Sequence, residues 1–143
     1  MQSFSVCFFY NTKDFNLSNR TRLKSFIQSL VKKEGKKISE IRIIFCGKAE
    51  MRAINKKYLN HDYDTDIITF PFSSPETPIE AELYINIPII KRQSKDFNCS
   101  FKEVLHRVIF HGVLHLCGYN DKSPSQITQM RTKENFYLEK YFS

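Results

Sequence analysis

The 143-residue chain lacks any hydrophobic run long enough to span a membrane, and its apolar start, residues 4–10, has neither a basic leader nor a small-residue cleavage site. Its four cysteines include no CxxC pair, which argues against a disulfide framework or a sulfur-ligated zinc site. Low-complexity segments are also absent. Together with an apolar content of 41%, these absences predict one compact domain over residues 1–143, located in the cytoplasm and independent of membranes.

Acidic residues are in the minority: 15 Asp and Glu stand against 22 Lys and Arg, which gives a net charge of +7. This excess favours a polyanionic partner, and nucleic acid fits better than a membrane because no basic amphipathic anchor is present. The densest positive stretch lies on one face of a helix predicted over residues 17–34 and in the residues just after it. Its candidate phosphate-contacting residues are Arg22, Lys32, Lys33, Lys36 and Lys37. A solvated helix face is the alternative explanation for the same charges.

Hydrophobic periodicity and turn residues predict four strands and five helices. The strands are expected at residues 4–10, 41–46, 66–72 and 81–87, with the last one antiparallel. The helices are expected at residues 17–34, 49–58, 87–95, 101–117 and 124–141. Because strands and helices alternate in the first half and helices fill the second, we expect an α+β fold with a small mixed four-stranded sheet packed with helices.

The segment His111-Gly-Val-Leu-His115-Leu-Cys-Gly118-Tyr-Asn-Asp121 has the spacing of three metal ligands. Two histidines four residues apart lie on one helical face, where neutral imidazoles can bind the same cation. Gly118 can take the left-handed conformation that ends a helix, so that the chain turns and presents Asp121 as a third ligand. The sequence therefore predicts a site for one divalent ion, with zinc expected, on the long penultimate helix and the turn after it.

Two neighbouring features refine this interpretation. Asp121 could instead cap the last helix, but Ser123-Pro124-Ser125-Gln126 supplies a complete capping box without it. The residue after the first histidine is Gly112, whereas zinc peptidases of the H-E-x-x-H type carry their general base, a glutamate, at that position. A metallopeptidase of this kind would lack its base, which makes it the weakest of the functional hypotheses.

The histidine motif resembles the signature H-G-x-L-H-L-x-G-Y-D-H of the YbeY endoribonucleases, also called rRNA maturation factors. Residues 55–58 and 65–71 are similar to the N-x-x-Y-R segment and the T-D-V-L-S-F-P strand of that family, and residues 81–85 resemble its G-D-I-x-I strand. Met130 and Glu134 suit its last helix. The resemblance extends from Ile41 to Leu138 and is most specific at the histidine motif.

Two positions depart from the family pattern. The third ligand of the family is usually histidine, whereas this chain has Asn120-Asp121, so that its metal site resembles a set of two histidines and one carboxylate. An anionic ligand lowers the net charge of the site and should make bound water less acidic. Leu59 stands where the tyrosine of the family is followed by an arginine.

The resemblance implies a metal-dependent, single-strand-specific endoribonuclease of rRNA maturation and ribosome biogenesis, acting at the 3′ end of the small-subunit RNA. Its partners would be precursor rRNA and the ribosomal subunit, and not DNA. Asp66 and Glu82 are the candidate proton-transferring residues, although Asp66 could instead cap or brace its strand. The alternative is a non-catalytic, metal-stabilised RNA- or ribosome-assembly factor, which Leu59 and the missing general base favour.

Overall fold

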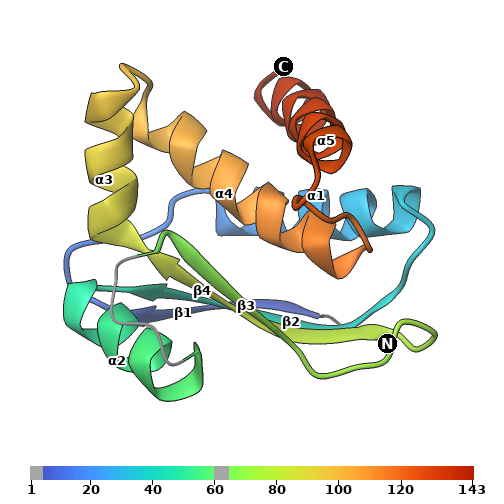
Figure 1. Cartoon of the computed structure of the whole chain (residues 1–143), viewed down its shortest axis with the longest axis horizontal. Coiled ribbons are helices and arrows are strands. Elements are labelled where there is room, and N and C mark those ends of the chain that lie inside the picture. Colours follow the sequence, from blue (N-terminus) through green and yellow to red (C-terminus); the bar gives the residue numbers. More distant parts are fainter. Residues whose placement is uncertain (1–4, 60–64) are drawn as a thin grey trace.

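The computed structural model describes residues 5–59 and 65–143, apart from the side chain of Leu59. In chain order its elements are β1 (Val6–Asn11), α1 (Arg20–Lys33), β2 (Ile38–Cys46), α2 (Lys48–Leu59), β3 (Ile67–Pro71), β4 (Ile79–Asn86), α3 (Ile87–Asp96), α4 (Phe101–Leu116) and α5 (Pro124–Phe142). Figure 1 shows α2 on one side of the sheet and the other helices on the opposite side, with α5 lying over α4. This arrangement confirms the predicted α+β class.

The four strands form one mixed sheet in the order β1-β2-β4-β3. The pairs β1/β2 and β2/β4 are parallel, and β3 runs antiparallel to β4. A parallel pair needs a long crossover connection, which α1 provides between β1 and β2, whereas the short segment between β3 and β4 suits an antiparallel hairpin. The predicted antiparallel strand is therefore confirmed with respect to β3, and its parallel pairing with β2 is an additional feature.

The predicted start of the first helix was wrong. Helix α1 begins at Arg20 and not at Leu17, because Asn19 takes a left-handed conformation, with φ 55° and ψ 39°, that interrupts the helical path. Leu17 lies before this turn and is 5% exposed, so its apolar side chain belongs to the core without belonging to the helix. The predicted first residue of the first strand, Phe4, lies outside the described residues, and β1 ends one residue later than predicted.

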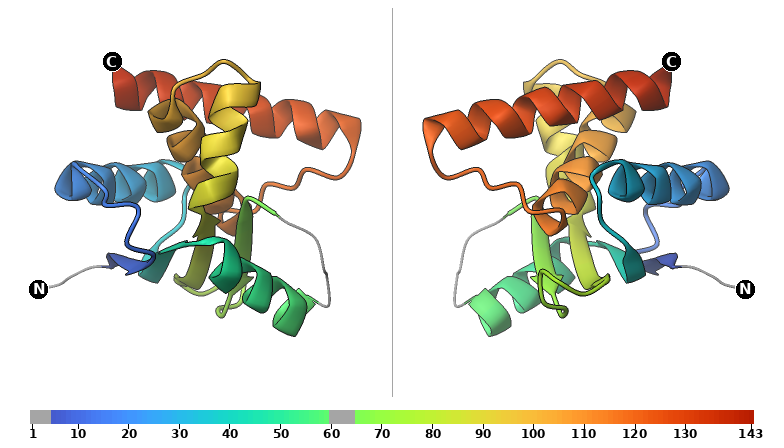
Figure 2. Two further views of the ribbon diagram at one scale, coloured as in Figure 1. Left: turned by 90° about the vertical axis from the view of Figure 1, so that its left-hand side faces the viewer. Right: turned by 90° about the vertical axis from the view of Figure 1, so that its right-hand side faces the viewer.

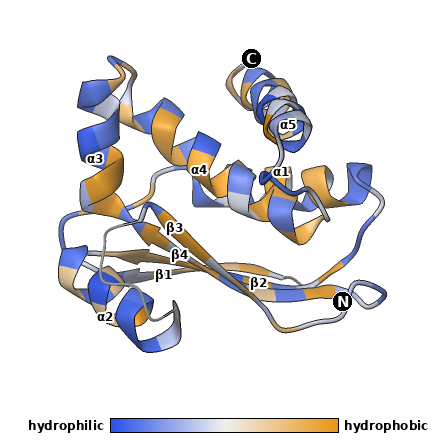
Figure 3. Cartoon of the chain, viewed as in Figure 1, coloured by the Kyte–Doolittle hydropathy of each residue, from blue (hydrophilic) through white to orange (hydrophobic). Residues whose placement is uncertain are grey.

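Helix α4 lies at the centre of the larger hydrophobic core, between the sheet and α5 (Figure 2). Its buried apolar side chains surround most of the helix: Val104, Leu105, Val108, Ile109, Phe110, Val113 and Leu114. Figure 3 shows that apolar segments of α4 and of the sheet face each other, while α2 carries polar residues outward. In the described part of the chain, no helix combines the length and the apolar character that a membrane span requires.

Gly112 marks a close approach between α4 and the sheet. A Cβ atom at this position would lie 2.6 Å from Cδ1 of Ile67 and 3.3 Å from both terminal methyl carbons of Leu83. The position of the general base in zinc peptidases therefore faces the sheet in this fold, where a glutamate side chain has no room. The packing supports the sequence-based argument against a metallopeptidase.

Larger residues at position 112 should destabilise the protein in proportion to their volume. We expect Gly112→Val to lower the free energy of unfolding by about 2–3 kcal/mol, because Ile67 and Leu83 must move to admit the side chain. The loss in Gly112→Ala should be smaller, since alanine favours the helix and Cδ1 of Ile67 is the flexible end of a side chain. Urea denaturation of both variants measures these differences, and unchanged midpoints would contradict the close approach.

Candidate metal centre

Three ligand atoms converge at the C-terminal end of α4. The Nε2 atoms of His111 and His115 lie 3.0 Å apart, and Oδ2 of Asp121 lies 3.2 Å from the first and 3.3 Å from the second. Ligands that surround zinc tetrahedrally at 2.0–2.1 Å are separated by about 3.3 Å. The residues predicted as ligands are thus brought together, and their donor atoms fit a single divalent cation.

The turn after α4 delivers Asp121 to the two histidines. Helix α4 ends at Leu116, and Gly118 takes the left-handed conformation predicted from the sequence, with φ 108°. Asp121 does not need to cap α5, because Ser123 and Gln126 form the complete capping box. The local signals of helix termination and initiation therefore leave the Asp121 carboxylate available for a ligand.

The other ring nitrogen of each histidine has a partner of its own. Nδ1 of His111 lies 2.6 Å from Oε2 of Glu134, and Nδ1 of His115 lies 2.9 Å from the backbone carbonyl oxygen of Tyr119. Both partners are acceptors, so each Nδ1 carries the proton and each Nε2 presents a lone pair. Two lone pairs and a carboxylate oxygen within 3.3 Å repel one another unless a proton or a cation lies among them. This is the arrangement of metal-binding histidines whose outer partners fix the tautomer.

Glu134 was not selected from the sequence as a site residue, yet it is the outer partner of His111. Its side chain is 6% exposed, and it accepts a 2.9 Å hydrogen bond from Nη1 of Arg107. Burial raises the pKa of Glu134, but the hydrogen bonds from His111 and Arg107 outweigh burial and leave the pKa below its ordinary value. The sequence did contain a signal: Glu134 lies on the buried stripe of α5 that includes Met130, Tyr137 and Tyr141.

The environment of His111 favours its charged form when no cation is bound. Burial lowers the pKa of His111, whereas the hydrogen bond to Glu134 and the nearby carboxylates of Asp121 and Asp66 raise it, with a net increase. The same concentration of negative charge attracts a metal cation, which competes with the proton for the imidazole.

A second carboxylate supports His115 indirectly, through the turn. Glu34, at the end of α1, accepts a hydrogen bond from the Tyr119 hydroxyl at 2.6 Å and another from the Tyr137 hydroxyl. It also forms an ion pair with Nζ of Lys133 at 3.2 Å. The backbone carbonyl of Tyr119 is the acceptor for His115. Glu34 thereby fixes the turn that holds one of the predicted ligands.

Removal of the Tyr119 hydroxyl should destabilise the protein. We expect Tyr119→Phe to lower the free energy of unfolding by about 1.5–3 kcal/mol at neutral pH, because the buried Glu34 carboxylate loses a hydrogen bond. Thermal or urea denaturation measures this loss. The control is Tyr58→Phe, which alters a tyrosine that is 60% exposed and should change stability little.

The effect of Tyr119→Phe should depend on pH. Burial raises the pKa of Glu34, but the hydrogen bonds from Tyr119, Tyr137 and Lys133 lower it by more. The net pKa is therefore below the ordinary value. A carboxyl group with a depressed pKa in the folded state stabilises the protein above its unfolded pKa, about 4.3, and this contribution is lost as the pH falls through the folded value. The difference between wild type and variant should therefore shrink in acid, and a difference that grows there would contradict this account.

The structure separates the two candidate proton-transferring residues. Asp66 lies next to the metal ligands and lines a cleft of about 980 Å³ together with His111, His115 and Asp121. Glu82 lies on β4 beside Leu83, which packs under α4, so Glu82 points to the opposite face of the sheet. There it accepts hydrogen bonds from Arg42 at 3.1 Å and from the Tyr84 hydroxyl at 2.6 Å. The structure therefore does not bring Glu82 to the histidines.

The predicted basic residues are similarly divided. Lys36 lines the cleft that contains the metal ligands. Lys32 and Lys33 lie at a second depression between α1 and α5, where Nζ of Lys33 is 5.0 Å from the centre of the Phe136 ring. Arg22 donates a hydrogen bond to the Tyr141 backbone carbonyl, with its guanidinium 4.1 Å from the centre of that ring. Lys37 is exposed beside Lys36.

The side chain of Leu59, at the position where the family pattern has an arginine, lies outside the described residues.

Comparison with known proteins places this chain in a family. A family description, Endoribonuclease YbeY, matches residues 9–142. The Endoribonuclease YbeY of Cytophaga hutchinsonii is 36% identical over 138 residues, covering 96% of each chain, and that of Chlorobium phaeovibrioides is 42% identical over 117 residues, covering 82% of this chain and 78% of the relative. The solution structure of TM1509 from Thermotoga maritima, at 25% identity, superposes with a TM-score of 0.69 over 96% of this chain and 89% of the other. The chain therefore belongs to the YbeY endoribonuclease family.

Proposed function

We propose that this protein is a metal-dependent, single-strand-specific endoribonuclease that acts in rRNA maturation, at the 3′ end of the small-subunit RNA, in the cytoplasm. The ligands would be His111, His115 and Asp121, the ion zinc, and the larger partner a ribosomal subunit. One observation carries the metal dependence: two imidazole Nε2 atoms and one carboxylate oxygen converge while both Nδ1 atoms are engaged elsewhere. The whole chain would act as one domain.

The site would supply two functions that phosphodiester hydrolysis uses, a place for the ion and an acceptor for the proton of water. A divalent ion in the site would polarise a phosphoryl oxygen and lower the pKa of the attacking water. The Asp66 carboxylate lines the same cleft and is the candidate to accept the proton of that water. Glu134 and the Tyr119 carbonyl keep the imidazole rings in the orientation that directs their Nε2 atoms to one point. Glu82 is left in a structural role with Arg42.

Two lysines of the cleft suit the RNA backbone. Lys36 and Lys122 line the cleft with the metal ligands, and both ammonium groups can contact phosphates on either side of the one that is cleaved. Single-stranded RNA is the form whose backbone can bend into such an opening, whereas a rigid duplex presents its backbone on a convex surface. Family membership supports RNA as the substrate.

Substitution of Lys36 should weaken RNA binding in a salt-dependent way. In Lys36→Ala we expect the Kd for a single-stranded RNA to rise about threefold to tenfold and the slope of log K against log salt to decrease by about 0.7, because one phosphate contact is lost. Fluorescence anisotropy at several salt concentrations measures both quantities. Lys37→Ala is the matched control, since it removes the same charge from the neighbouring residue outside the cleft. Equal effects of the two variants would argue against a specific role of Lys36.

The proposed function is tested by RNA cleavage with defined metal content. Wild-type protein freed of metal should be inactive on a single-stranded rRNA fragment, and addition of about one equivalent of zinc should restore cleavage. Asp121→Ala, which removes the carboxylate ligand, should lose both the ion and the activity while remaining folded. A protein that binds the ion and the RNA without cleaving it would instead be the assembly factor. Cleavage that persists without metal would overturn the proposal.

A further inference from the structure

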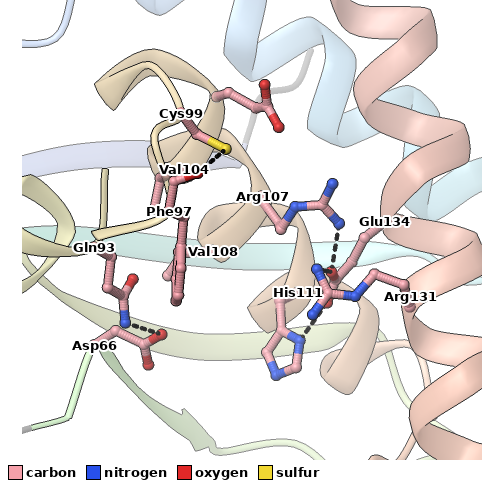
Figure 4. A pocket seen from close by; sticks show the side chains of 11 residues that line it. Asp66, Gln93, Phe97, Cys99, Val104, Arg107, Val108, His111, Arg131 and Glu134 are labelled. Carbon is pink, nitrogen blue, oxygen red and sulfur yellow. Dashed lines mark hydrogen bonds and ion pairs between the residues drawn. The ribbon is translucent and has the colours of Figure 1, made fainter. Parts of the chain in front are cut away.

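A second cavity opens beside the metal centre, on the side of α3. It has a volume of about 460 Å³, within the range of about 300–1,000 Å³ that is typical of small-ligand sites. His111 and Asp66 line both this cavity and the cleft of the metal ligands, so a strand bound in the cleft passes directly by its opening. Figure 4 shows Phe97 and Val108 between the Gln93 and Asp66 pair on one side and His111 with Glu134 on the other.

The walls of this cavity suit a flat ring with a polar edge. Phe97, Val104 and Val108 supply the apolar part. Phe97 is 65% exposed, which leaves its ring available for stacking. Nε2 of Gln93 donates a 3.5 Å hydrogen bond to Oδ2 of Asp66, and this contact turns the amide so that its carbonyl oxygen points away from the carboxylate. An amide that is held in this way can accept a hydrogen bond from an N–H group of a ligand.

The charges of the cavity decide between a phosphate and a base. Three carboxylates line it, those of Asp66, Glu103 and Glu134, against two guanidinium groups. Both guanidinium groups also face Glu134, Arg107 at 2.9 Å and Arg131 at 3.8 Å. Because the carboxylates outnumber the guanidinium groups, the cavity offers a phosphate no excess of positive charge, whereas a neutral nucleobase needs none. The cleft with Lys36 therefore suits phosphates better than this cavity does, and this cavity suits an uncharged ring.

We propose that this cavity is a nucleobase subsite, in which the base next to the scissile phosphate stacks on Phe97 and hydrogen-bonds to Gln93. The inference rests on the proposed function, because that function places single-stranded RNA in the adjoining cleft. RNA single strands are recognised in this way, by unstacked bases that lie on aromatic rings and bond through their polar edges. The subsite would fix the register of the strand, so that one particular phosphate lies at the three ligands.

The test couples removal of the ring to removal of the base. A short single-stranded RNA is prepared intact and as a set in which each position in turn is abasic, and its Kd is measured by fluorescence anisotropy in EDTA. For wild type, we expect the Kd to rise about tenfold at one abasic position. For Phe97→Ala, the intact RNA should bind about tenfold more weakly, and that abasic position should have no further effect. Gln93→Ala should weaken binding of the intact RNA about fivefold, through the base at that same position.

The control variant is Phe9→Ala, which removes another exposed ring, 46% exposed, on β1, the strand at the edge of the sheet farthest from β3. It should retain the complete abasic pattern of wild type. If no abasic position matters for wild type, or if the abasic penalties are unchanged in Phe97→Ala, the subsite does not exist. Cleavage by zinc-loaded wild type is measured on the same intact RNA. If the abasic penalty disappears in Phe97→Ala but the RNA is not cleaved, the subsite stands and the proposed catalytic function is wrong. If the RNA is cleaved but the abasic penalty is unchanged in Phe97→Ala, the catalytic function stands and the subsite is wrong.

Discussion

Replacing His115 by alanine should abolish metal-dependent cleavage of single-stranded RNA, with a rate loss of at least about a thousandfold. The variant keeps two of the three proposed ligands, His111 and Asp121. An ion contributes several kcal/mol to a hydrolytic transition state, and about 4 kcal/mol corresponds to a thousandfold change in rate. The fold should survive, because the His115 side chain is 27% exposed and water can bond to the vacated Tyr119 carbonyl. Elemental analysis, circular dichroism and cleavage assays of the same preparation measure the three properties.

His106 on the same helix provides the opposite control. It is 4% exposed, its Nδ1 lies 2.7 Å from the Lys102 carbonyl oxygen, and its ring stacks on Tyr141 at 4.8 Å between centres. His106→Ala should therefore lower the free energy of unfolding by about 2 kcal/mol or more and leave the metal content unchanged. The interpretation of α4 as the metal-binding helix fails if His115→Ala retains one ion per chain, or if His106→Ala loses it at a temperature where it is folded.

Replacing Glu134 by alanine should affect both stability and metal affinity. We expect the free energy of unfolding to fall by about 3 kcal/mol, because Arg107 and His111 lose the buried carboxylate that they share. Metal affinity should fall about 10- to 100-fold, as expected when the outer partner of a ligating histidine is removed. Glu134→Gln keeps an acceptor for His111 without the charge, so its metal affinity should lie between those of wild type and Glu134→Ala. Calorimetric titration with zinc and urea denaturation measure the two effects.

The control for this prediction is Glu139→Ala, an exposed glutamate on the same helix, which should change neither quantity. The stability difference should again depend on pH. Since the pKa of Glu134 lies below its ordinary value in the folded protein, its contribution is present above about pH 4.3 and disappears as the pH falls through the folded pKa. A metal affinity equal to that of wild type in Glu134→Ala would show that His111 is oriented without its carboxylate partner.

The sequence predicted that His111, His115 and Asp121 lie together because their geometry is local. An i, i+4 histidine pair, a glycine with φ 108° at the helix end and a capping box in the next helix all lie within the sixteen residues from His111 to Gln126, so their spacing determines how the candidate ligands meet. The α+β class was predicted for a related reason, since the hydrophobic period of each segment identifies its type. The periodic pattern missed the left-handed backbone at Asn19, and it placed the starts of β2 and β4 too late, since these strands begin at Ile38 and Ile79.

Local residue patterns alone therefore predicted the set of elements and the three candidate ligand positions. Packing brings distant residues to the site. Glu134 of α5 contacts His111, Glu34 at the end of α1 contacts Tyr119, and Asp66 lines the same cleft as the two histidines, whereas Glu82 lies on the opposite face of the sheet. A hydrophobic period of 2.0 or 3.6 residues identifies the buried face of a strand or helix, but it does not identify the element against which that face packs. The partner is fixed only when the strands pair and the helices pack, across separations of up to about a hundred residues in the chain.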